Sequence, residues 1–293
     1  MMLLKDFIKD GTASLSSLYP QEEARSIMNF YCSEVFGFPS YQHITEPSTE
    51  VPAELLDQAL EDMRRLAASE PLQYVLGYTE FCGRTYNVDA RALIPRAETE
   101  VLCMKAEEMV AGRKPADQLK ILDLCTGSGC IAWTLALDLP GASVIATDLS
   151  KEALDLASGQ FKRISKKAVR PRFVVADLLD VDGTVEAVGG PYFDLITANP
   201  PYVQPSEKPE MRPNVLGWEP HMAIFAPDRD PLAFHRAIAV TASRLLAPNG
   251  CAIVELNTEL AEETAAVFAD AGFSSVRIVP DWFDRPRFVS FER

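Results

Sequence analysis

Hydrophobic positions in the first quarter of the chain recur at helical spacing. Between about Leu3 and Leu76, apolar side chains appear every three or four residues, which is typical of amphipathic helices that pack against one another. Prolines at positions 39, 47, 52 and 71 separate these segments, as expected for short irregular links. We interpret the stripes as the core of a small helical bundle, formed by Leu4, Phe7, Ile8, Ala24, Ile27, Met28, Tyr31, Val35, Leu55, Leu56, Ala59, Leu60, Met63 and Leu66.

From Glu98 onward, apolar runs alternate with helical segments. This alternation predicts a mostly parallel sheet with helices on both faces. The last two strands are expected to be antiparallel. The predicted strands lie near residues 120–124, 142–148, 172–177, 193–198, 251–256, 276–279 and 287–291, and a helix is predicted over 259–271.

The stretch between these two parts is rich in aromatic and β-branched residues around Gly83, which predicts a β-hairpin over about 78–90. We therefore expect a helical domain at 1–77, a β-hairpin linker at 78–92 and an α/β domain at 93–293. Within the last domain, residues 204–230 are rich in proline and lack periodicity. We interpret this long connection as a functional lid or binding loop, with structural filler as the simpler alternative.

The apolar strand at 193–198 ends in Asn199, Pro200, Pro201 and Tyr202. Both prolines have a fixed φ and no N–H, and a residue before proline is held extended, so the turn is rigid and its carbonyls are free to accept. A planar –NH2 group can donate to the Asn199 side-chain oxygen and to a backbone carbonyl while the Tyr202 ring covers one face. For the tetrapeptide alone, a stiff turn is the simpler interpretation.

Upstream strand ends favour a binding site instead. Residues 125–129, Cys-Thr-Gly-Ser-Gly, join a strand to a helix, and glycines there let a backbone approach a ligand closely. Two further strands end in Asp148 and Asp177. Each aspartate taken singly is typical of a helix N-cap or turn. In an open α/β sheet, however, ligands bind beyond the carboxyl ends of the strands, so we expect these residues to share one site.

This order of strand ends resembles that of the S-adenosylmethionine-dependent methyltransferases. The resemblance implies an α/β fold with a Rossmann-like class I methyltransferase sheet, and S-adenosylmethionine as the cofactor, with S-adenosylhomocysteine as its product. Asp148 is then expected to bind the ribose hydroxyls and Asp177 the adenine amine. The implied cofactor-binding residues are Cys125, Thr126, Gly127, Ser128, Gly129, Asp148, Asp177, Leu178 and Asn199.

Four more motifs, at 71–77, 81–83, 93–100 and 219–224, resemble the protein-glutamine N5-methyltransferases that act on peptide-chain release factors, the PrmC/HemK family. The resemblance covers nearly the whole chain. It implies methyl transfer to the side-chain amide nitrogen (N5) of a release-factor glutamine, with the helical domain recognising the protein substrate. The implied catalytic residues are Asn199, Pro200 and Tyr202, and the implied substrate-binding residues are Asn199, Pro200, Pro201, Tyr202, Glu219, Arg96 and Glu98.

Several positions depart from the family pattern. Cys125 stands where glycine is usual, so it must either keep a negative φ or accept strain. Leu178 follows Asp177 where some relatives carry an aromatic residue, which favours aliphatic contact with adenine. Residues 255–257 read Glu-Leu-Asn instead of the more usual Glu-Ile-Gly, and residues 281–285 lack an expected glycine.

Composition bears on the cellular compartment and on whether the protein binds a metal. The start of the chain mixes four charges with its apolar residues, which does not fit a signal peptide or a membrane span, so we expect a cytoplasmic protein. The six cysteines form no Cys-x-x-Cys pair and mostly lie in apolar runs, so they are interpreted as small buried side chains. No His or Cys spacing fits a zinc site, and no metal is expected.

Charge limits the partners. The net charge is −14, and residues 1–90 carry six Lys/Arg against fourteen Asp/Glu, which disfavours direct nucleic-acid recognition. A basic run at 162–172 is interpreted first as a solvated helix end and second as a docking patch for an acidic or ribosome-bound partner.

Three alternatives remain open beside a release-factor substrate. They are glutamine methylation of a ribosomal protein, methylation of an exocyclic amine of a nucleobase, because that class also carries Asn-Pro-Pro-Tyr, and a catalytically silent adaptor.

Overall fold

The computed structural model describes residues 2–161, 168–190 and 192–293, and its chain divides into two compact units. A helical unit comprises Met1–Gly77 together with Met211–Trp218. An α/β unit comprises Tyr78–Glu210 and Glu219–Arg293. Positions 162–167 of the basic run lie outside the described residues.

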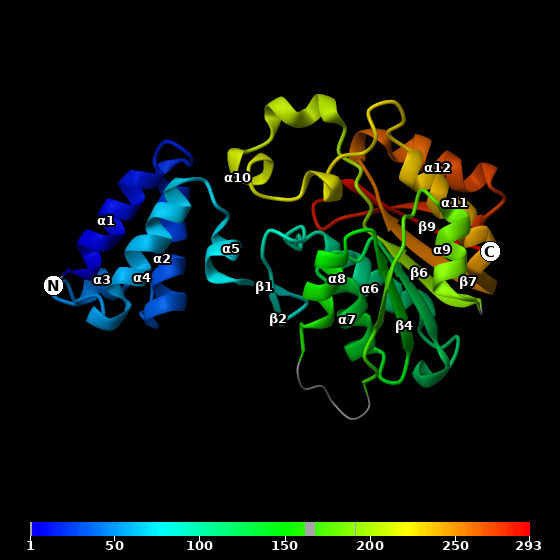
Figure 1. Cartoon of the computed structure of the whole chain (residues 1–293), viewed down its shortest axis with the longest axis horizontal. Coiled ribbons are helices and arrows are strands. Elements are labelled where there is room, and N and C mark those ends of the chain that lie inside the picture. The colour runs from blue at the N-terminus through cyan, green and yellow to red at the C-terminus, as the bar shows by residue number, and fades with distance from the viewer. Residues whose placement is uncertain (1, 162–167, 191) are drawn as a thin grey trace. The chain divides into compact units, whose positions relative to one another are not determined.

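The helical unit is built around the apolar stripes that the sequence contains. Phe7 and Tyr31 are almost fully buried in its core, with the side chain of Met28 beside them. A Cβ added at Gly11 would overlap Met28, so the missing side chain lets the first two helices approach closely. The helices are α1 (Leu4–Leu15), α2 (Gln21–Phe36), α3 (Gln42–Thr45), α4 (Ala53–Ala67) and α5 (Leu72–Leu76) (Figure 1).

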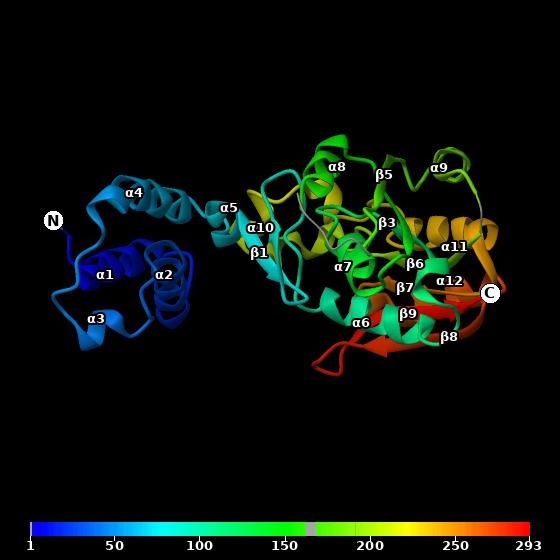
Figure 2. The ribbon, with the colours of Figure 1, turned by 90° about the horizontal axis from the view of Figure 1, so that it is seen from below.

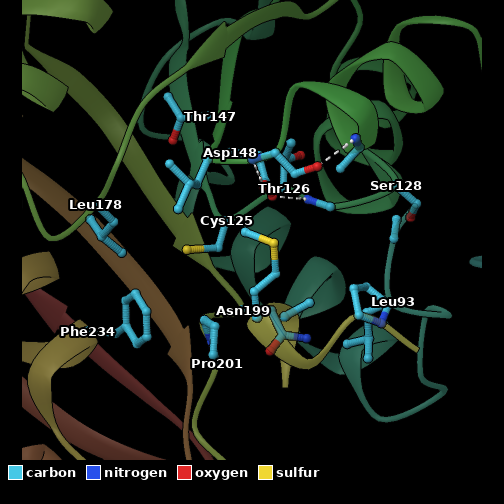
Figure 3. Close-up of a pocket in the computed structure, with 18 of the residues that line it drawn as sticks. Leu93, Cys125, Thr126, Ser128, Thr147, Asp148, Leu178, Asn199, Pro201 and Phe234 are labelled. Carbon is cyan, nitrogen blue, oxygen red and sulfur yellow. Dashed lines mark hydrogen bonds between the residues drawn. The ribbon is translucent and has the colours of Figure 1, made fainter. Parts of the chain in front are cut away.

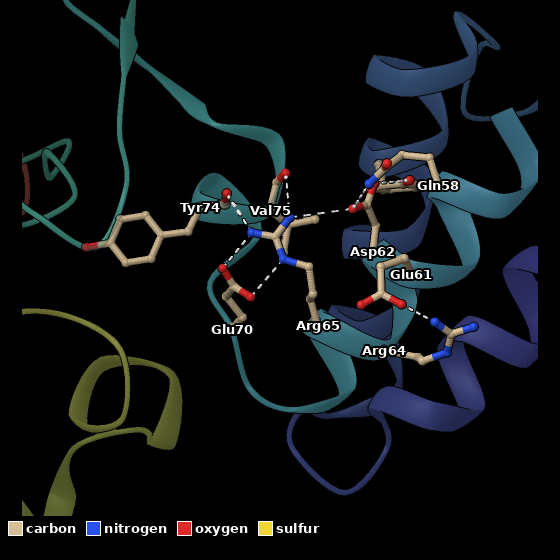
Figure 4. A network of polar contacts seen from close by, with 9 residues as sticks. Gln58, Glu61, Asp62, Arg64, Arg65, Glu70, Tyr74 and Val75 are labelled. Carbon is tan, nitrogen blue, oxygen red and sulfur yellow. Dashed lines mark hydrogen bonds and ion pairs between the residues drawn. The ribbon is translucent and has the colours of Figure 1, made fainter. Parts of the chain in front are cut away.

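A polar network joins α4 to α5 (Figure 4). The Arg65 guanidinium donates to both carboxylate oxygens of Glu70, at 2.6 and 2.9 Å, and to the carbonyls of Tyr74 and Val75. These bonds satisfy carbonyls in a short helix that has few partners of its own. Arg65 thereby fixes how the chain leaves the bundle before Gly77.

Residues 211–218 belong to the helical unit although they follow the Asn-Pro-Pro-Tyr turn in sequence. Arg212 pairs with Glu23 and lies over the Tyr19 ring, and the Trp218 indole donates to the Ala68 carbonyl at 3.3 Å. Our prediction from the sequence had assigned this segment to the α/β domain at 93–293. The contacts that assign it to the other unit are all between positions far apart in the chain.

The α/β unit contains a seven-stranded sheet in the order β5-β4-β3-β6-β7-β9-β8. The first five of these strands are parallel, and β9 pairs antiparallel with both β7 and β8. This arrangement confirms the expected class I sheet. Its strands are β3 (Lys120–Leu124), β4 (Ser143–Asp148), β5 (Arg172–Val175), β6 (Phe193–Ala198), β7 (Leu246–Glu255), β8 (Ser274–Pro280) and β9 (Pro286–Glu292).

Helices cover both faces of the sheet because successive strand residues point to opposite sides. Ile121 packs in one apolar core and its neighbour Leu122 in the other. Helices α6 and α7 contribute to the first core, and α11 and α12 to the second (Figures 1 and 2). The helices of this unit are α6 (Thr99–Val110), α7 (Cys130–Asp138), α8 (Lys151–Ser158), α9 (Val181–Val188), α11 (Ala233–Leu245) and α12 (Ala261–Asp270).

Two local expectations need correction. The segment 204–230, which was expected to be one long connection without periodicity, holds three short helical turns, η2 (Pro205–Glu210), α10 (Pro213–Leu216) and η3 (His221–Ala223). Strand β7 begins at Leu246 rather than Cys251. Short turns and polar strand starts leave no periodic signal in a sequence, which explains both differences. Before the sheet, β1 (Tyr78–Phe81) and β2 (Arg84–Asn87) pair as an antiparallel hairpin.

Asp123 lies near the end of β3 and is fully buried. Its carboxylate accepts hydrogen bonds from the Thr126 hydroxyl at 2.6 Å and the Thr197 hydroxyl at 2.8 Å. Desolvation by burial raises the pKa of Asp123 to about 7, and the nearby charge of Asp148 also raises it. The side chain joins the loop after β3 to strand β6.

The raised pKa of Asp123 predicts a pH dependence of stability. Between about pH 4 and pH 7 the folded protein holds a proton on Asp123 that the unfolded chain has released, so this residue's contribution to stability falls as the pH rises through that window. Asp123→Asn removes the titration. We expect the variant to gain stability relative to wild type across this range, by at most ~1.4 kcal/mol per pH unit.

Urea unfolding of both proteins between pH 4 and pH 8 measures this difference. Asp270→Asn, at the exposed end of α12, serves as the control and should run parallel to wild type. Parallel curves for Asp123→Asn and wild type would contradict the prediction.

Candidate active site

A cavity of about 330 Å³ opens at the carboxyl ends of the parallel strands. This volume falls in the range of small-molecule sites. Strand β3 pairs with β4 on one side and with β6 on the other, so the cavity lies where the strand order reverses, the usual ligand position in open α/β sheets. In Figure 3, Thr126, Ser128 and Asp148 lie along one side of the cavity, and Leu178, Phe234 and Pro201 lie along another.

The loop after β3 is held by its own backbone and by its neighbours. The Thr126 N–H donates to the Thr147 carbonyl at 2.9 Å, and the Gly127 N–H donates to the Asp148 carboxylate at 2.8 Å. Gly129 has φ +81°, and a Cβ there would lie 2.8 Å from the Ala157 Cβ. Glycine is therefore required at this position both for its conformation and for space. The loop presents its backbone to the cavity.

Of the two backbone conformations considered for Cys125, a negative φ or a strained positive φ, the structure has the strained one. Its φ is +57°, in the left-handed region that costs a non-glycine residue roughly 1–2 kcal/mol. Burial, followed by the negative charge of Asp148, raises the pKa of the thiol well above its usual value. The thiol therefore stays protonated and uncharged where it lines the cavity.

Asp148 lines the cavity at the end of β4. One carboxylate oxygen accepts from Gly127 N–H and the other from Ser150 N–H at 2.9 Å. Desolvation raises its pKa, and these backbone bonds oppose that rise. Each carboxylate oxygen has more than one acceptor position, so hydroxyl donors of a ligand can still bind.

Asp177 and Leu178 also line the cavity. Asp177 accepts from the Leu179 N–H at 2.9 Å through one oxygen. Leu178 is buried, and with Phe234 it supplies an apolar wall; contact of Leu178 with adenine stays a prediction. Among the implied cofactor residues, the cavity lining includes Cys125, Thr126, Gly127, Ser128, Asp148, Asp177, Leu178 and Asn199.

Only part of the Asn-Pro-Pro-Tyr turn lines the cavity. Asn199 and Pro201 line the cavity, whereas Pro200 and Tyr202 are absent from its described lining. The Tyr202 hydroxyl donates to Glu255 at 2.8 Å instead. Stacking of the Tyr202 ring on a substrate amide stays a prediction, and in this structure its hydroxyl serves to anchor the turn to β7.

Arg96 and Glu219 form an ion pair whose carboxylate is buried. The Arg96 guanidinium donates to Glu219 at 2.7 Å, and the Ile94 N–H donates to the second oxygen of the same carboxylate at 3.1 Å. Glu219 is only 4% exposed, so the pair is more than a solvated surface contact. It ties the chain before α6 to the segment beyond the turn. Arg96 lines the cavity, and Glu98 occupies the N-cap of α6 outside the lining.

Sequence reasoning gave no role to Thr99 or Glu255. The Thr99 hydroxyl donates to Glu255 at 2.8 Å, and the Asn199 amide group donates to Thr99 at 3.3 Å. Thr99 and Glu255 are both buried. The one available signal was an acidic residue at the end of the apolar run 251–256, where a buried carboxylate needs donors.

No helix among the described residues is both long and apolar enough to cross a bilayer. The described residues also contain no group of three or more His, Cys, Asp or Glu side chains arranged to hold a metal ion.

Comparison with known sequences gives two family matches. The profile of the PrmC N-terminal domain matches residues 6–77, and that of a methyltransferase domain matches residues 121–214. A solved structure of a release factor-specific protein-(glutamine-N5) methyltransferase from Alicyclobacillus acidocaldarius is 27% identical, with a TM-score of 0.44, over 71% of this chain and 99% of that one.

Two curated relatives match over almost their full length. The release factor glutamine methyltransferase of Bacteroides thetaiotaomicron is 36% identical over 96% of both chains. That of Flavobacterium psychrophilum is 33% identical over 98% of both chains. With this identity across both units, the chain belongs to the release factor glutamine methyltransferase family.

Proposed function

We propose that this protein transfers a methyl group from S-adenosylmethionine to the side-chain amide nitrogen of a glutamine in a peptide-chain release factor. Membership of the family supports the activity. The observation that carries it in this chain is that Asn199 and the loop after β3 line one cavity. This shared lining supports a site in which the Asn199 side-chain oxygen accepts from the substrate amide next to a loop that binds the cofactor.

The residues of the cavity fit the cofactor. The turn 125–129 offers backbone and small side chains, Asp148 offers acceptors for two ribose hydroxyls, and Leu178 with Phe234 offers an apolar surface for a purine. Asp177, in the same lining, offers a carboxylate that suits an exocyclic amine. When bound, S-adenosylmethionine supplies a methyl group made electrophilic by its sulfonium.

The residues of this chain must promote attack by the substrate amide nitrogen, which is a weak nucleophile. An amide nitrogen delocalises its lone pair into the carbonyl. With its two hydrogens held by the Asn199 side-chain oxygen and by a backbone carbonyl of the Asn-Pro-Pro-Tyr turn, the nitrogen is oriented and partial pyramidalisation is favoured. Positioning of this kind contributes on the order of 7 kcal/mol when the reacting groups are held in line. No strong general base is required, because the methylated nitrogen is acidic enough to lose its proton to water.

A release factor is favoured over the other substrates. The net charge of −14 disfavours a DNA or RNA substrate. A ribosomal-protein glutamine would fit the same amide acceptors, and the family match favours the release factor over it. A cytoplasmic location follows from a substrate that works in translation.

Incubation of the protein with methyl-labelled cofactor and, separately, a release factor, a ribosomal protein and DNA tests the proposal. We expect label on one glutamine of the release factor. Label confined to the ribosomal protein or DNA would reject this substrate, and label on none of the three would reject methyl transfer to all of them.

Asn199→Ala removes the proposed acceptor for the substrate amide. We expect kcat to fall by roughly 100-fold or more, as for loss of a preorganised hydrogen-bonding group at other active sites. The dissociation constant of the cofactor should stay nearly unchanged in calorimetric titration. Asn87→Ala, at an exposed strand position, is the control. Near-normal turnover of Asn199→Ala would refute the role.

Asp148→Ala removes acceptors for the ribose and for the Gly127 N–H. Hydrogen bonds to a charged group contribute about 1.5–3 kcal/mol, so we expect cofactor affinity to fall by roughly tenfold or more. Titration with S-adenosylhomocysteine measures this loss directly. Asp155→Ala, on the exposed face of α8, should bind like wild type. Unchanged affinity of Asp148→Ala would place the ribose elsewhere.

A further inference from the structure

A buried carboxylate at the end of β7 receives two hydroxyl groups. Glu255 is 1% exposed, and its two oxygens accept from Tyr202 and Thr99, each at 2.8 Å. Its backbone is also held, because the His235 Nε2 lies 3.0 Å from the Glu255 carbonyl. Burial lowers the pKa of His235 to about 4, so the ring is neutral at pH 7 and Nε2–H donates to this carbonyl.

The direction of these hydrogen bonds decides how Asn199 is oriented. A threonine hydroxyl has one hydrogen, and that of Thr99 is committed to Glu255. Its oxygen can then only accept from the Asn199 side chain, 3.3 Å away. The NH2 half of the Asn199 amide must therefore face Thr99. This assignment follows from counting donors and is independent of how the two ends of the amide are distinguished.

The opposite half of the amide is its oxygen, which has no hydrogen-bond partner among the described residues and belongs to a residue that lines the cavity. We propose that Glu255 and Thr99 are positioning residues that turn the Asn199 side chain so that its oxygen accepts from the substrate amide. The inference rests on the proposed function and extends it by naming what orients the acceptor. An Asn199 side chain turned the other way would present its NH2 group to the –NH2 of the substrate, and two donors cannot hydrogen-bond to each other.

Charges around Glu255 bear on whether it acts as an acceptor. Burial is the largest effect on Glu255 and raises its pKa above the usual value, although the hydrogen bonds from Tyr202 and Thr99 and the positive charge of Arg287 oppose that rise. The negative charge of Glu98 has a smaller effect and also raises the pKa of Glu255. Two hydroxyl donors and a nearby guanidinium match an ionised carboxylate that accepts through both oxygens.

Paired substitutions at Thr99 separate the hydroxyl from the packing. Thr99→Val keeps the shape of the side chain and removes the hydroxyl, whereas Thr99→Ser keeps the hydroxyl and removes a methyl group. We expect kcat with the release factor to fall by roughly tenfold or more in Thr99→Val, since misplaced reacting groups react far more slowly. Thr99→Ser should retain most of the wild-type kcat. Cofactor affinity should be unchanged in both.

Thr264→Val is the matched control, because Thr264 is fully buried on α12 and its hydroxyl has no hydrogen-bond partner in the described structure. It should leave kcat and cofactor affinity at wild-type values. Equal loss of kcat in Thr99→Val and Thr99→Ser, or a loss of kcat that only follows loss of cofactor binding, would assign Thr99 a packing role and overturn the proposal.

Glu255→Met tests the second member of the pair. It removes both acceptors and frees the Thr99 hydrogen to bond the Asn199 oxygen, which reverses the amide. We expect a fall in kcat, and a smaller loss in the double variant with Thr99→Val than the product of the two single losses, because both act through Asn199. Multiplicative losses would mean independent effects and would overturn the link.

A readout without substrate keeps this test separate from the proposed function. Side-chain amide signals of Asn199, assigned by their absence in Asn199→Ala, should show one hydrogen protected from exchange in wild type and Thr99→Ser. That protection should be lost in Thr99→Val. A wild-type protein that methylates no release factor would reject the proposed substrate while this signal still decides the orientation. Equal protection in all three proteins would overturn the inference.

Discussion

The parallel pairing of β3 with β6 is the constraint on which the site depends. Leu124 lies opposite Ala198 in this pair, so the loop after β3 and the turn after β6 leave the sheet at the same edge. Asp123 then joins the two through the hydroxyls of Thr126 and Thr197. The methyl group of the cofactor and the amide nitrogen of the substrate must be held close together. A rigid pair of neighbouring strands provides that alignment with little conformational freedom left to lose.

Features with a local signature could be predicted from the sequence. The apolar stripes of the helical unit and the alternating runs of the sheet follow from side-chain periodicity, and both have the expected class of structure. The glycine loop and the Asn-Pro-Pro-Tyr turn could be recognised because proline and glycine limit the backbone directly. For Cys125 the sequence posed two alternatives, and only the backbone angle of +57° distinguishes them.

Features made by distant residues could not be predicted in this way. Thr99 and Glu255 are separated by more than half the chain, and the sequence around each residue gives no indication that the two are hydrogen-bonded. Tyr202 was recognised as part of the turn, yet the direction of its hydroxyl depends on Glu255, which follows 53 residues later at the end of β7. Hydrogen-bond direction in a buried network is set by the whole set of donors and acceptors, which no single segment contains.

The excursion of residues 211–218 has a consequence for the chain as a whole. The polypeptide leaves the α/β unit after Glu210, adds a turn to the helical unit and re-enters at Glu219. The two units are thus joined by three covalent crossings rather than one. A cut after Gly77 would sever one of these three crossings and would leave the Arg212–Glu23 and Trp218–Ala68 contacts as links between the two fragments. Expression of residues 78–293 alone would leave the Trp218 indole and the Arg212 guanidinium without the Ala68 carbonyl and the Glu23 carboxylate.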